Sequence, residues 1–427
     1  MISILEYGKI SNSEIFARTD VKTNVEDVVA AIIADVRESG DAALKKYGEK
    51  FDGVKLESLE VTVAEFDEAM NKVDAKFIEI LEKAAKNIRR FHAAQKREDY
   101  IIPAENGAIL GQRIIPIEKV GMYVPGGTAA YPSTVLMDCI PAKIAGCEEI
   151  VMVTPPGRDG KVNPDVLAAA KIAGVDRVFK VGGAQAIAAL AYGTESIPRV
   201  YKIVGPGNAF VAEAKKQVFG QVSIDMIAGP SEILVIADST ANPRNVAADL
   251  LSQAEHDKLA SAVLVTDSLS LAKAVQAELE VQIPQLERAE IARASIDNNG
   301  KIIVAPTLDI AIDIANELAP EHLEVCLETP LDYLAKIKNA GSIFLGKYCP
   351  EALGDYMAGP NHTLPTSGTA HFSSPLSVDD FVKKSQFIYY TREAFEGIAR
   401  DVEYFANKEG LTAHGKSAVI RFEEDVK

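Results

Sequence analysis

The feature that most constrains this chain's fold is an alternation of short β-branched segments with helical segments from about residue 120 onward. Alternation of this kind predicts βαβ units, and therefore parallel sheets with helices on both faces. Two successive series of such units predict two Rossmann-like domains. The predicted strands are Ile150–Val153, Val178–Val181, Val200–Val204, Ile233–Ile236, Ala262–Thr266, Ile302–Val304 and Ser342–Leu345.

Charge is distributed unevenly over these two series. The segment from Val120 to Ser231 holds 10 Lys and Arg against 9 Asp and Glu, whereas the whole chain has a net charge of −16. A near-neutral, glycine-rich middle predicts an inserted domain whose loops approach a ligand closely. We therefore expect an N-terminal extension, a discontinuous first Rossmann-like domain, an inserted Rossmann-like domain and a C-terminal tail, at residues 1–23, 24–119 with 232–374, 120–231, and 375–427.

The two ends of the chain carry different patterns. Thr62-Val-Ala-Glu65 is a capping box, and the apolar stripe from Phe66 to Phe91 predicts one long amphipathic helix. His92 lies off that stripe, so we expect it to be exposed to solvent. The tail has about 50 residues, too few for a stable core of its own, and we expect it to pack on another domain or on a partner subunit.

Composition excludes several classes of function. The acidic net charge argues against a nucleic acid or an anionic membrane as the main partner. No apolar run approaches the roughly 18 residues that cross a bilayer, and the start of the chain lacks the layout of a signal peptide. Four cysteines without a CxxC pair predict buried, reduced thiols. We therefore expect a cytoplasmic enzyme.

Four glycine-rich turns lie in the near-neutral segment or at its end. Taken singly, each is more often a tight turn than a binding loop, and none is a GxGxxG fingerprint. Four in one window favour a ligand cleft in which backbone N–H groups and helix N-termini hold a phosphate. The turns are Tyr123–Gly127, Val181–Gln185, Val204–Asn208 and Ala228–Ser231.

Polar pairs in the second series predict a metal and acid–base site. Gln253 and His256 are three residues apart, so on a helix they share a face and suit one metal ion. Glu321 and His322 lie where a helical pattern gives way to a strand-like one, which suits general acid–base chemistry, although a surface pair is the default for an isolated Glu-His.

Two further pairs occur closer to the C-terminus. Asp355 and His362 offer a carboxylate and an imidazole in a glycine-rich loop. Glu409 and His414 are five residues apart, and on a continuous helix they would point in different directions. Both face one site only if a turn intervenes, and Gly410 permits one.

In this order, the motifs resemble the histidinol dehydrogenase family over essentially the whole chain. The resemblance implies oxidation of L-histidinol to L-histidine through L-histidinaldehyde by two NAD+, the last step of histidine biosynthesis. The motifs that carry it are Tyr123-Val-Pro-Gly-Gly, Gly182-Gly-Ala-Gln, Val204-Gly-Pro-Gly-Asn, Ala228-Gly-Pro-Ser-Glu, Asp249-Leu-Leu-Ser-Gln-Ala-Glu-His-Asp, Ala319-Pro-Glu-His-Leu-Glu, Gly354-Asp-Tyr, Gly359-Pro-Asn-His and Glu409-Gly-Leu-Thr-Ala-His.

The resemblance also implies a role for each site residue and a homodimer with shared active sites. The inserted domain binds NAD+, and the discontinuous domain carries catalysis and one Zn2+ per subunit. The tail contributes to the partner's active site, and the terminal extensions pack on the partner subunit. The implied residues are catalytic Glu321 and His322; zinc ligands Gln253, His256, Asp355 and His414; NAD+ contacts Tyr123, Gln185 and Asn208; and substrate contacts Ser231, Gln253, His256, His322, Asp355, Glu409 and His414.

Two other functions stay open on the residues alone. A zinc hydrolase would use Glu321 to activate a metal-bound water. A non-catalytic NAD-binding or metal-sensing protein would bind its ligand without converting it. Incubation with zinc, NAD+ and L-histidinol separates the three, because only the dehydrogenase increases the absorbance of reduced nicotinamide.

Overall fold

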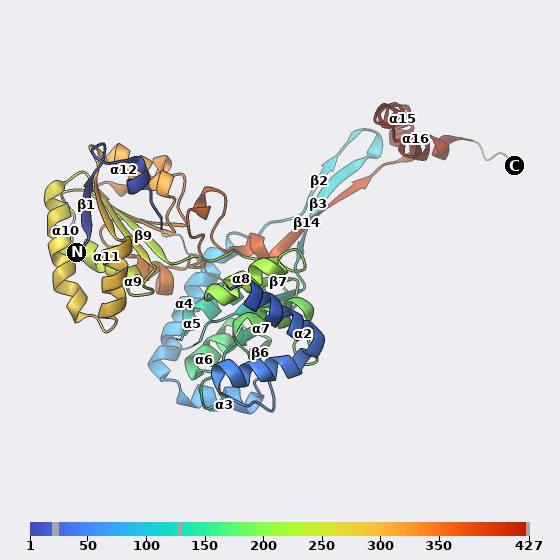
Figure 1. Ribbon diagram of the computed structural model, residues 1–427. Helices are drawn as coiled ribbons and strands as arrows, with labels where there is room; N and C mark the ends of the chain where they lie inside the picture. Colours follow the sequence, from blue (N-terminus) through green and yellow to red (C-terminus); the bar gives the residue numbers. More distant parts are fainter. Residues whose placement is uncertain (19–24, 127–129, 424–427) are drawn as a thin grey trace. The chain divides into compact units, whose positions relative to one another are not determined.

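The computed structural model describes residues 1–18, 25–126 and 130–423 (Figure 1). These residues form two compact units. The first comprises Met1–Gln95 and Ile117–Phe381, and the second comprises Lys96–Pro116 and the chain from Val382 on. The first unit contains a six-stranded and a five-stranded sheet, and the second contains a three-stranded sheet.

In the six-stranded sheet the strand order is β1-β11-β10-β9-β12-β13, and every neighbouring pair is parallel. Helices α9, α10 and α11 pack against one face of this sheet, and α12 and the short α1 pack against the other (Figure 1). The elements are β1 (Ser3–Glu6), α1 (Asn12–Ile15), β9 (Glu232–Ala237), α9 (Pro243–Ala254), β10 (Ser261–Thr266), α10 (Leu269–Gln282), α11 (Ala289–Asn299), β11 (Lys301–Val304), α12 (Leu308–Leu318), β12 (His322–Cys326) and β13 (Ser342–Leu345).

The five-stranded sheet is also parallel, in the order β6-β5-β4-β7-β8. Each of its first four strands is followed by one helix, as the sequence pattern predicts. The elements are β4 (Lys119–Tyr123), α5 (Pro132–Ala145), β5 (Glu149–Thr154), α6 (Pro164–Ala173), β6 (Arg177–Lys180), α7 (Gly183–Tyr192), β7 (Lys202–Val204), α8 (Ala209–Val218) and β8 (Ser223–Ile224).

Each of the seven predicted strands coincides with a strand of these two sheets, which confirms the α/β fold class. The two sheets also share one connectivity. In each, the chain builds two strands outward from a central strand (β4 or β9) and then crosses to its other side to form β7 or β12. The order of strands therefore reverses between β4 and β7 and between β9 and β12. Such reversal points are where ligands bind in open parallel sheets.

The N-terminal helices α2 (Glu26–Tyr47), α3 (Val63–Lys72) and α4 (Ala75–Ala93) pack with the five-stranded sheet. Helix α2 contacts α7 and α8, and its apolar residues share the core of that sheet. Helix α3 contacts α6, and α4 contacts α5 and α6. The expected division grouped residues 24–119 with 232–374 and set 1–23 apart. The helices instead bury their apolar faces on the helices of the five-stranded sheet, and β1 pairs with β11.

Two details of these helices differ from the sequence-based expectation. The apolar stripe is not one helix, because the chain breaks at Val73, and Asp74 begins α4 by accepting a hydrogen bond from the N–H of Phe77 (3.2 Å). His92, expected to be exposed, is fully buried, and its Nδ1 lies 2.7 Å from Oε1 of Gln95. A wider face of α4 is buried than the stripe implies, because the helix packs against α5, α6 and a later turn. The predicted capping box between Thr62 and Glu65 is present.

The second unit is a three-stranded antiparallel sheet with short helices. Strand β3 lies between β14 and β2. Among the described helices of the whole chain, none combines the length and apolarity needed to cross a bilayer. The elements are β2 (Tyr100–Pro103), β3 (Ile109–Pro116), β14 (Val382–Tyr389), α14 (Arg392–Glu396), α15 (Ala399–Lys408) and α16 (Thr412–Val419).

Candidate active site and metal centre

His322 is the first residue of β12, at the edge of the six-stranded sheet where the parallel strands begin. Its Nδ1 lies 3.0 Å from the backbone oxygen of Glu232, the first residue of the neighbouring β9. A carbonyl oxygen can only accept, so Nδ1 carries the hydrogen and Nε2 keeps its lone pair. Nε2 is buried without a hydrogen-bond partner among the described residues. Burial lowers the pKa of His322 to about 4, which leaves a neutral imidazole whose free nitrogen can accept a proton.

Glu321 precedes His322 and is also buried. Its Oε2 accepts a hydrogen bond from the N–H of Glu232 (2.9 Å) and lies 3.6 Å from Nδ1 of His322. Burial raises the pKa of Glu321 well above its ordinary value. A carboxyl group with a raised pKa is a stronger base when it is ionised, which suits proton transfer near neutral pH.

The backbone around this pair is tightly constrained. Ala319 directly follows helix α12 and adopts a left-handed conformation (φ 41°) that is unusual for a residue other than glycine. A Cβ on Gly341 would lie only 2.4 Å from the backbone oxygen of Glu321, so glycine is required there. These constraints fix the direction in which the two side chains leave the strand.

A group of metal-capable side chains adjoins His322. His322, Glu351 and Asp355 each offer a ligand atom, and these atoms lie within 4.8 Å of one another. Glu351 begins the short helix α13 (Glu351–Leu353), and Asp355 lies in the turn that follows, Gly354–Ala358. Oε1 of Glu351 lies 3.7 Å from Nε2 of His322 and has no hydrogen-bond partner among the described residues.

Gln253 and His256 come from the end of α9. Gln253 is almost fully buried, and neither atom of its amide group has a partner in the described part of the chain. The helix ends at Ala254, so the two residues do not share a helical face as expected. A turn joins them instead, with the N–H of His256 donating to the backbone oxygen of Gln253 (3.1 Å). Nδ1 of His256 lies 3.5 Å from the hydroxyl of Ser231.

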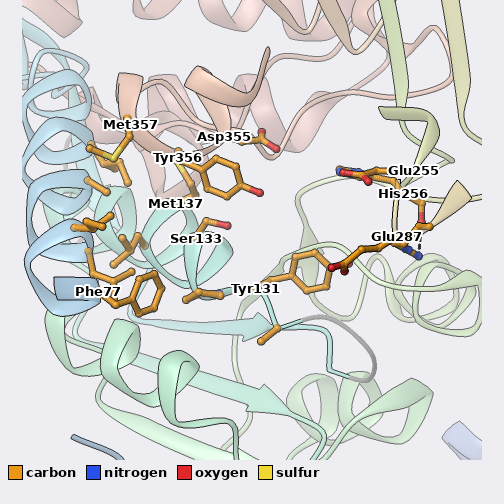
Figure 2. A pocket seen from close by; sticks show the side chains of 18 of the residues that line it. Phe77, Tyr131, Ser133, Met137, Glu255, His256, Glu287, Asp355, Tyr356 and Met357 are labelled. Atoms are coloured by element: carbon orange, nitrogen blue, oxygen red, sulfur yellow. Dashed lines mark hydrogen bonds between the residues drawn. The ribbon is translucent and has the colours of Figure 1, made fainter. Parts of the chain in front are cut away.

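These donors suit a zinc ion. Zinc takes nitrogen and oxygen ligands, and an unpaired buried polar atom is costly unless something binds it. Unpaired buried atoms gather here on Gln253, His322 and Glu351. His256 and Asp355 also border one cavity of about 630 Å³ (Figure 2). The lining of that cavity does not include Ser231, Gln253, Glu321, His322 or the expected cofactor residues.

The two expected site residues of the tail lie in the second unit. Glu409 directly follows α15, and His414 lies in α16. Between them Gly410 has a φ of 78°, so the turn that the spacing requires is present. Their place in the zinc and substrate sites stays a prediction.

The expected cofactor residues lie at the ends of neighbouring strands of the five-stranded sheet. Tyr123 is the last residue of β4, and its hydroxyl accepts a hydrogen bond from the N–H of Gly183 (3.1 Å) at the start of α7. Gln185 is buried, and its Oε1 has no partner among the described residues. Asn208 caps α8 by accepting from the N–H groups of Phe210 and Val211, which leaves its amide nitrogen for a ligand. The strand order reverses here, so the donors suit a dinucleotide.

Sequence reasoning did not assign a role to Glu351 or to His362. Nδ1 of His362 lies 3.5 Å from Oδ1 of Asp355, and its Nε2 lies 3.3 Å from the hydroxyl of Thr134. Burial disfavours the charged form of His362, but Asp355 outweighs that effect and raises its pKa. The sequence pairs His362 with Asp355 in one glycine-rich loop, which is a usable signal, whereas Glu351 has none beyond following a proline.

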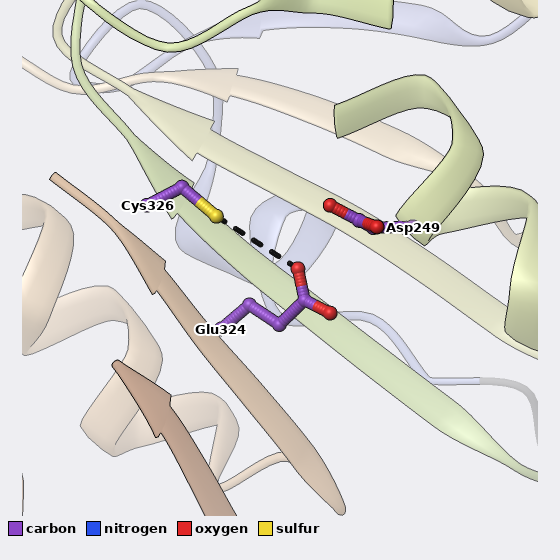
Figure 3. Close-up of side chains that lie close together, drawn as sticks. All are labelled: Asp249, Glu324 and Cys326. Atoms are coloured by element: carbon purple, nitrogen blue, oxygen red, sulfur yellow. Dashed lines mark hydrogen bonds between the residues drawn. The ribbon is translucent and has the colours of Figure 1, made fainter. Parts of the chain in front are cut away.

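A second cluster of buried or half-buried polar side chains, formed by Asp249, Glu324 and Cys326, contacts the backbone of Glu351. Glu324 is fully buried on β12, two residues after His322, and its Oε1 accepts a hydrogen bond from the N–H of Glu351 (2.6 Å). Its other oxygen faces the thiol of Cys326, and Asp249 of α9 lies beside them (Figure 3). Burial raises the pKa of Glu324 to about 9. The group therefore anchors α13 while holding a proton of its own.

The fold and this site define an α/β enzyme with a metal-capable centre and a second parallel sheet whose strand order reverses as in dinucleotide-binding folds. A family model described as histidinol dehydrogenase matches residues 17–422. The histidinol dehydrogenase of Bacillus cereus is 57% identical over 405 residues, which cover 95% of this chain and 94% of that protein. That of Clostridium acetobutylicum is 54% identical over 427 residues, 99% of each.

A solved structure gives the same result. The crystal structure of histidinol dehydrogenase from Elizabethkingia anophelis matches with a TM-score of 0.94 at 39% identity, and the match covers 98% of each chain. The chain belongs to the histidinol dehydrogenase family, so it is an NAD-dependent oxidoreductase of histidine biosynthesis in a family that uses zinc.

Proposed function

We propose that this chain oxidises L-histidinol to L-histidine through L-histidinaldehyde, with Glu321 and His322 as its acid–base residues. The observation that carries the assignment is the unpaired Nε2 of His322. It is a buried, neutral nitrogen held by the Nδ1–H···O bond to Glu232 and bordered by metal-capable groups. Alcohol oxidation needs a base that takes the hydroxyl proton as hydride leaves carbon, and a neutral imidazole is suited to that task.

The second oxidation needs water to add to the aldehyde before hydride leaves again. Glu321 is the proposed base for that water, because burial raises its pKa and its Oε2 is already held by the N–H of Glu232. In this proposal the two bases move separate protons. His322 serves the substrate hydroxyl at Nε2, and Glu321 serves the water at its carboxylate.

We propose that Gln253, His256 and Asp355 hold Zn2+ together with His414 of a second copy. When bound, zinc would bind the imidazole and amine of the substrate and so orient its reacting carbon. Ser231, His322 and the tail residue Glu409 are the further substrate contacts in this proposal. Burial disfavours the charged form of Asp355, but the neighbouring His362 outweighs that effect and lowers its pKa, so this carboxylate favours a cationic amino alcohol over a neutral one.

We propose that NAD+ binds across the reversal point of the five-stranded sheet at Tyr123, Gln185 and Asn208, in the domain of residues 120–231. When bound, it accepts the hydride from the substrate carbon in each of the two oxidations. The N-termini of α7 and α8 are the two helix ends near its phosphates, and burial of the unpaired Gln185 Oε1 supports a ligand there.

We propose that the active enzyme is a homodimer whose tails complete each other's sites. Large apolar side chains of the second unit are exposed, and a unit of this size buries little surface of its own. A second copy is the proposed cover for them. These side chains include Tyr100, Ile101, Ile102, Ile388, Tyr389, Tyr404 and Phe405.

We place the enzyme in the cytoplasm. Cys139, Cys147 and Cys326 are buried and Cys349 is partly buried, and all four are free thiols. Reduced thiols are typical of that compartment.

One assay tests the proposed function. Purified protein is incubated with zinc, NAD+ and L-histidinol, and reduced nicotinamide is followed by its absorbance while L-histidine is measured by chromatography. We expect two reduced nicotinamides for each L-histidine formed. The hydrolase alternative predicts neither nicotinamide reduction nor loss of L-histidinol, which has no bond that water can cleave, and the sensor alternative predicts NAD+ binding without turnover.

A further inference from the structure

A buried ion pair clamps the turn that follows β7. The N–H of Gly205 donates to Oδ2 of Asp225 (2.8 Å), and its backbone oxygen accepts from Nζ of Lys215 (3.0 Å). Lys215 and Asp225 are paired with each other, and each side chain is only 2% exposed. This turn leads directly to Asn208, one of the proposed NAD+ contacts. The ion pair therefore holds both the N–H and the backbone oxygen of Gly205, three residues before the proposed cofactor contact Asn208.

Asp138 of α5 approaches the same turn from the other side. It is fully buried, and its Oδ1 accepts a hydrogen bond from the hydroxyl of Thr363 (2.9 Å). Its Oδ2 has no partner among the described residues and faces Gly205, because a Cβ on that glycine would lie 3.2 Å from it. Burial and the neighbouring Asp225 raise the pKa of Asp138 to about 7.

Thr363 belongs to the loop that carries the proposed zinc ligand Asp355. In that loop Asn361 donates to the backbone oxygen of Met137 (2.7 Å) and accepts from the N–H of Thr363 (2.8 Å). His362 lies between Asp355 and Thr134 of α5. Three consecutive loop residues therefore engage α5, and Asp138 is the α5 side chain that meets both this loop and the turn at Gly205.

We propose that Asp138 is a positioning residue that holds the cofactor turn at Gly205 in register with the loop bearing Asp355. The inference rests on the proposed NAD+ and metal sites. A carboxyl group buried this completely costs more desolvation than an apolar side chain of the same size. Asp138 links two segments through its hydrogen bond with Thr363 and its contact with Gly205, and these segments carry the proposed metal and cofactor residues. Such a link serves catalysis, because hydride transfer requires cofactor and substrate to be placed to within a fraction of an ångström.

A purely structural role makes a different prediction. If Asp138 only filled space in the core, its removal would lower stability without changing the affinity for cofactor. If Asp138 positions the turn, loss of its hydrogen bond to Thr363 weakens cofactor binding and raises the KM for L-histidinol together. Removing Asp138 and Thr363 in one variant then has no larger effect than removing either alone.

The test compares Asp138→Ala, Thr363→Val and the double variant with the wild-type holoenzyme. Asp138→Asn keeps an oxygen that accepts from Thr363. Cys139→Ala is the matched control, since Cys139 is the next residue of α5 and is equally buried. The readouts are the Kd for NADH from its fluorescence, the KM values for NAD+ and L-histidinol, zinc content and the unfolding temperature.

We expect Asp138→Ala and Thr363→Val each to raise the Kd for NADH and the KM for L-histidinol about tenfold, which lies within the range by which coupled sites change each other's affinity. The double variant should match the worse single one. Asp138→Asn should stay within about twofold of wild type, and Cys139→Ala should leave both constants unchanged.

Unchanged NADH affinity in both single variants, or additive losses in the double variant, would overturn the positioning role. Those results leave the proposed function standing as long as the wild type oxidises L-histidinol. A wild type that neither binds NADH nor oxidises L-histidinol would overturn both.

Discussion

Replacement of His322 by asparagine tests the proposed base most directly. The amide nitrogen of asparagine can still donate to the backbone oxygen of Glu232, as Nδ1 does at 3.0 Å, but nothing replaces the lone pair at Nε2. Loss of a general base lowers the rate by about 10²–10⁴-fold, or about 3–5 kcal/mol of transition-state free energy. The retained hydrogen bond, worth about 1 kcal/mol, limits the effect on folding and substrate binding. We therefore expect a fall in kcat that is much larger than the change in KM caused by losing the substrate contact at Nε2.

The assay is steady-state reduction of NAD+ by the zinc-loaded His322→Asn variant, with zinc content and unfolding temperature measured on the same sample. His371→Asn is the matched control, because His371 is an exposed histidine whose Nε2 lies 3.3 Å from the backbone oxygen of Glu317. A kcat for His322→Asn above about one-tenth of the wild-type value, with zinc retained, would refute the reasoning, because that loss is smaller than general-base catalysis requires.

Three further predictions follow from the described contacts. Burial lowers the pKa of His92, so protonation of its imidazole favours the unfolded chain. The free energy of unfolding of the wild type, measured in urea, should therefore fall relative to that of His92→Gln as the pH drops below about 6.5. The same pH dependence in both proteins would contradict this. A methyl group in Gly205→Ala would lie 2.1 Å from the backbone oxygen of Tyr123 at a φ of 111°, so we expect a loss of about 2–4 kcal/mol in the free energy of unfolding and weaker NADH fluorescence binding. If the sites are shared between subunits, His414→Asn and Tyr123→Phe homodimers should each be impaired. Subunit exchange in an equal mixture should then restore about a quarter of wild-type turnover. If mass spectrometry shows that exchange has occurred but activity does not recover, the result counts against shared sites.

The alternation of strands and helices was predictable because a buried parallel strand needs a β-branched run, whatever it packs against. How the helices pack was not. The segment from Phe66 to Phe91 shows a helical stripe, but nothing in that stripe indicates which sheet its helices cover. Helix α4 illustrates the limit, because its contacts with α5 and α6 bury His92, which lies off the main stripe.

Candidate site residues were predictable where chemistry and local spacing coincide, as in Glu321-His322. Glu351 was not, because its function depends on three tertiary contacts. Ser252 donates to its Oε2 (3.1 Å), Glu324 holds its backbone, and Nε2 of His322 faces its Oε1. None of these partners is near it in sequence, and a glutamate at the start of a short helix is common for capping reasons alone.

The shared strand order of the two sheets explains why one fold type suits two ligands of opposite charge. The proposed NAD+ contacts lie where α7 and α8 begin, and the positive end of a helix dipole favours a pyrophosphate. The proposed metal and acid–base residues lie where α9 and α12 end, and the negative end favours a cation. The near-neutral charge of residues 120–231 and the acidic remainder reinforce the same division. The chain therefore uses the carboxyl edge of one parallel sheet for an anionic cofactor and the amino edge of the other for a divalent cation and a cationic substrate.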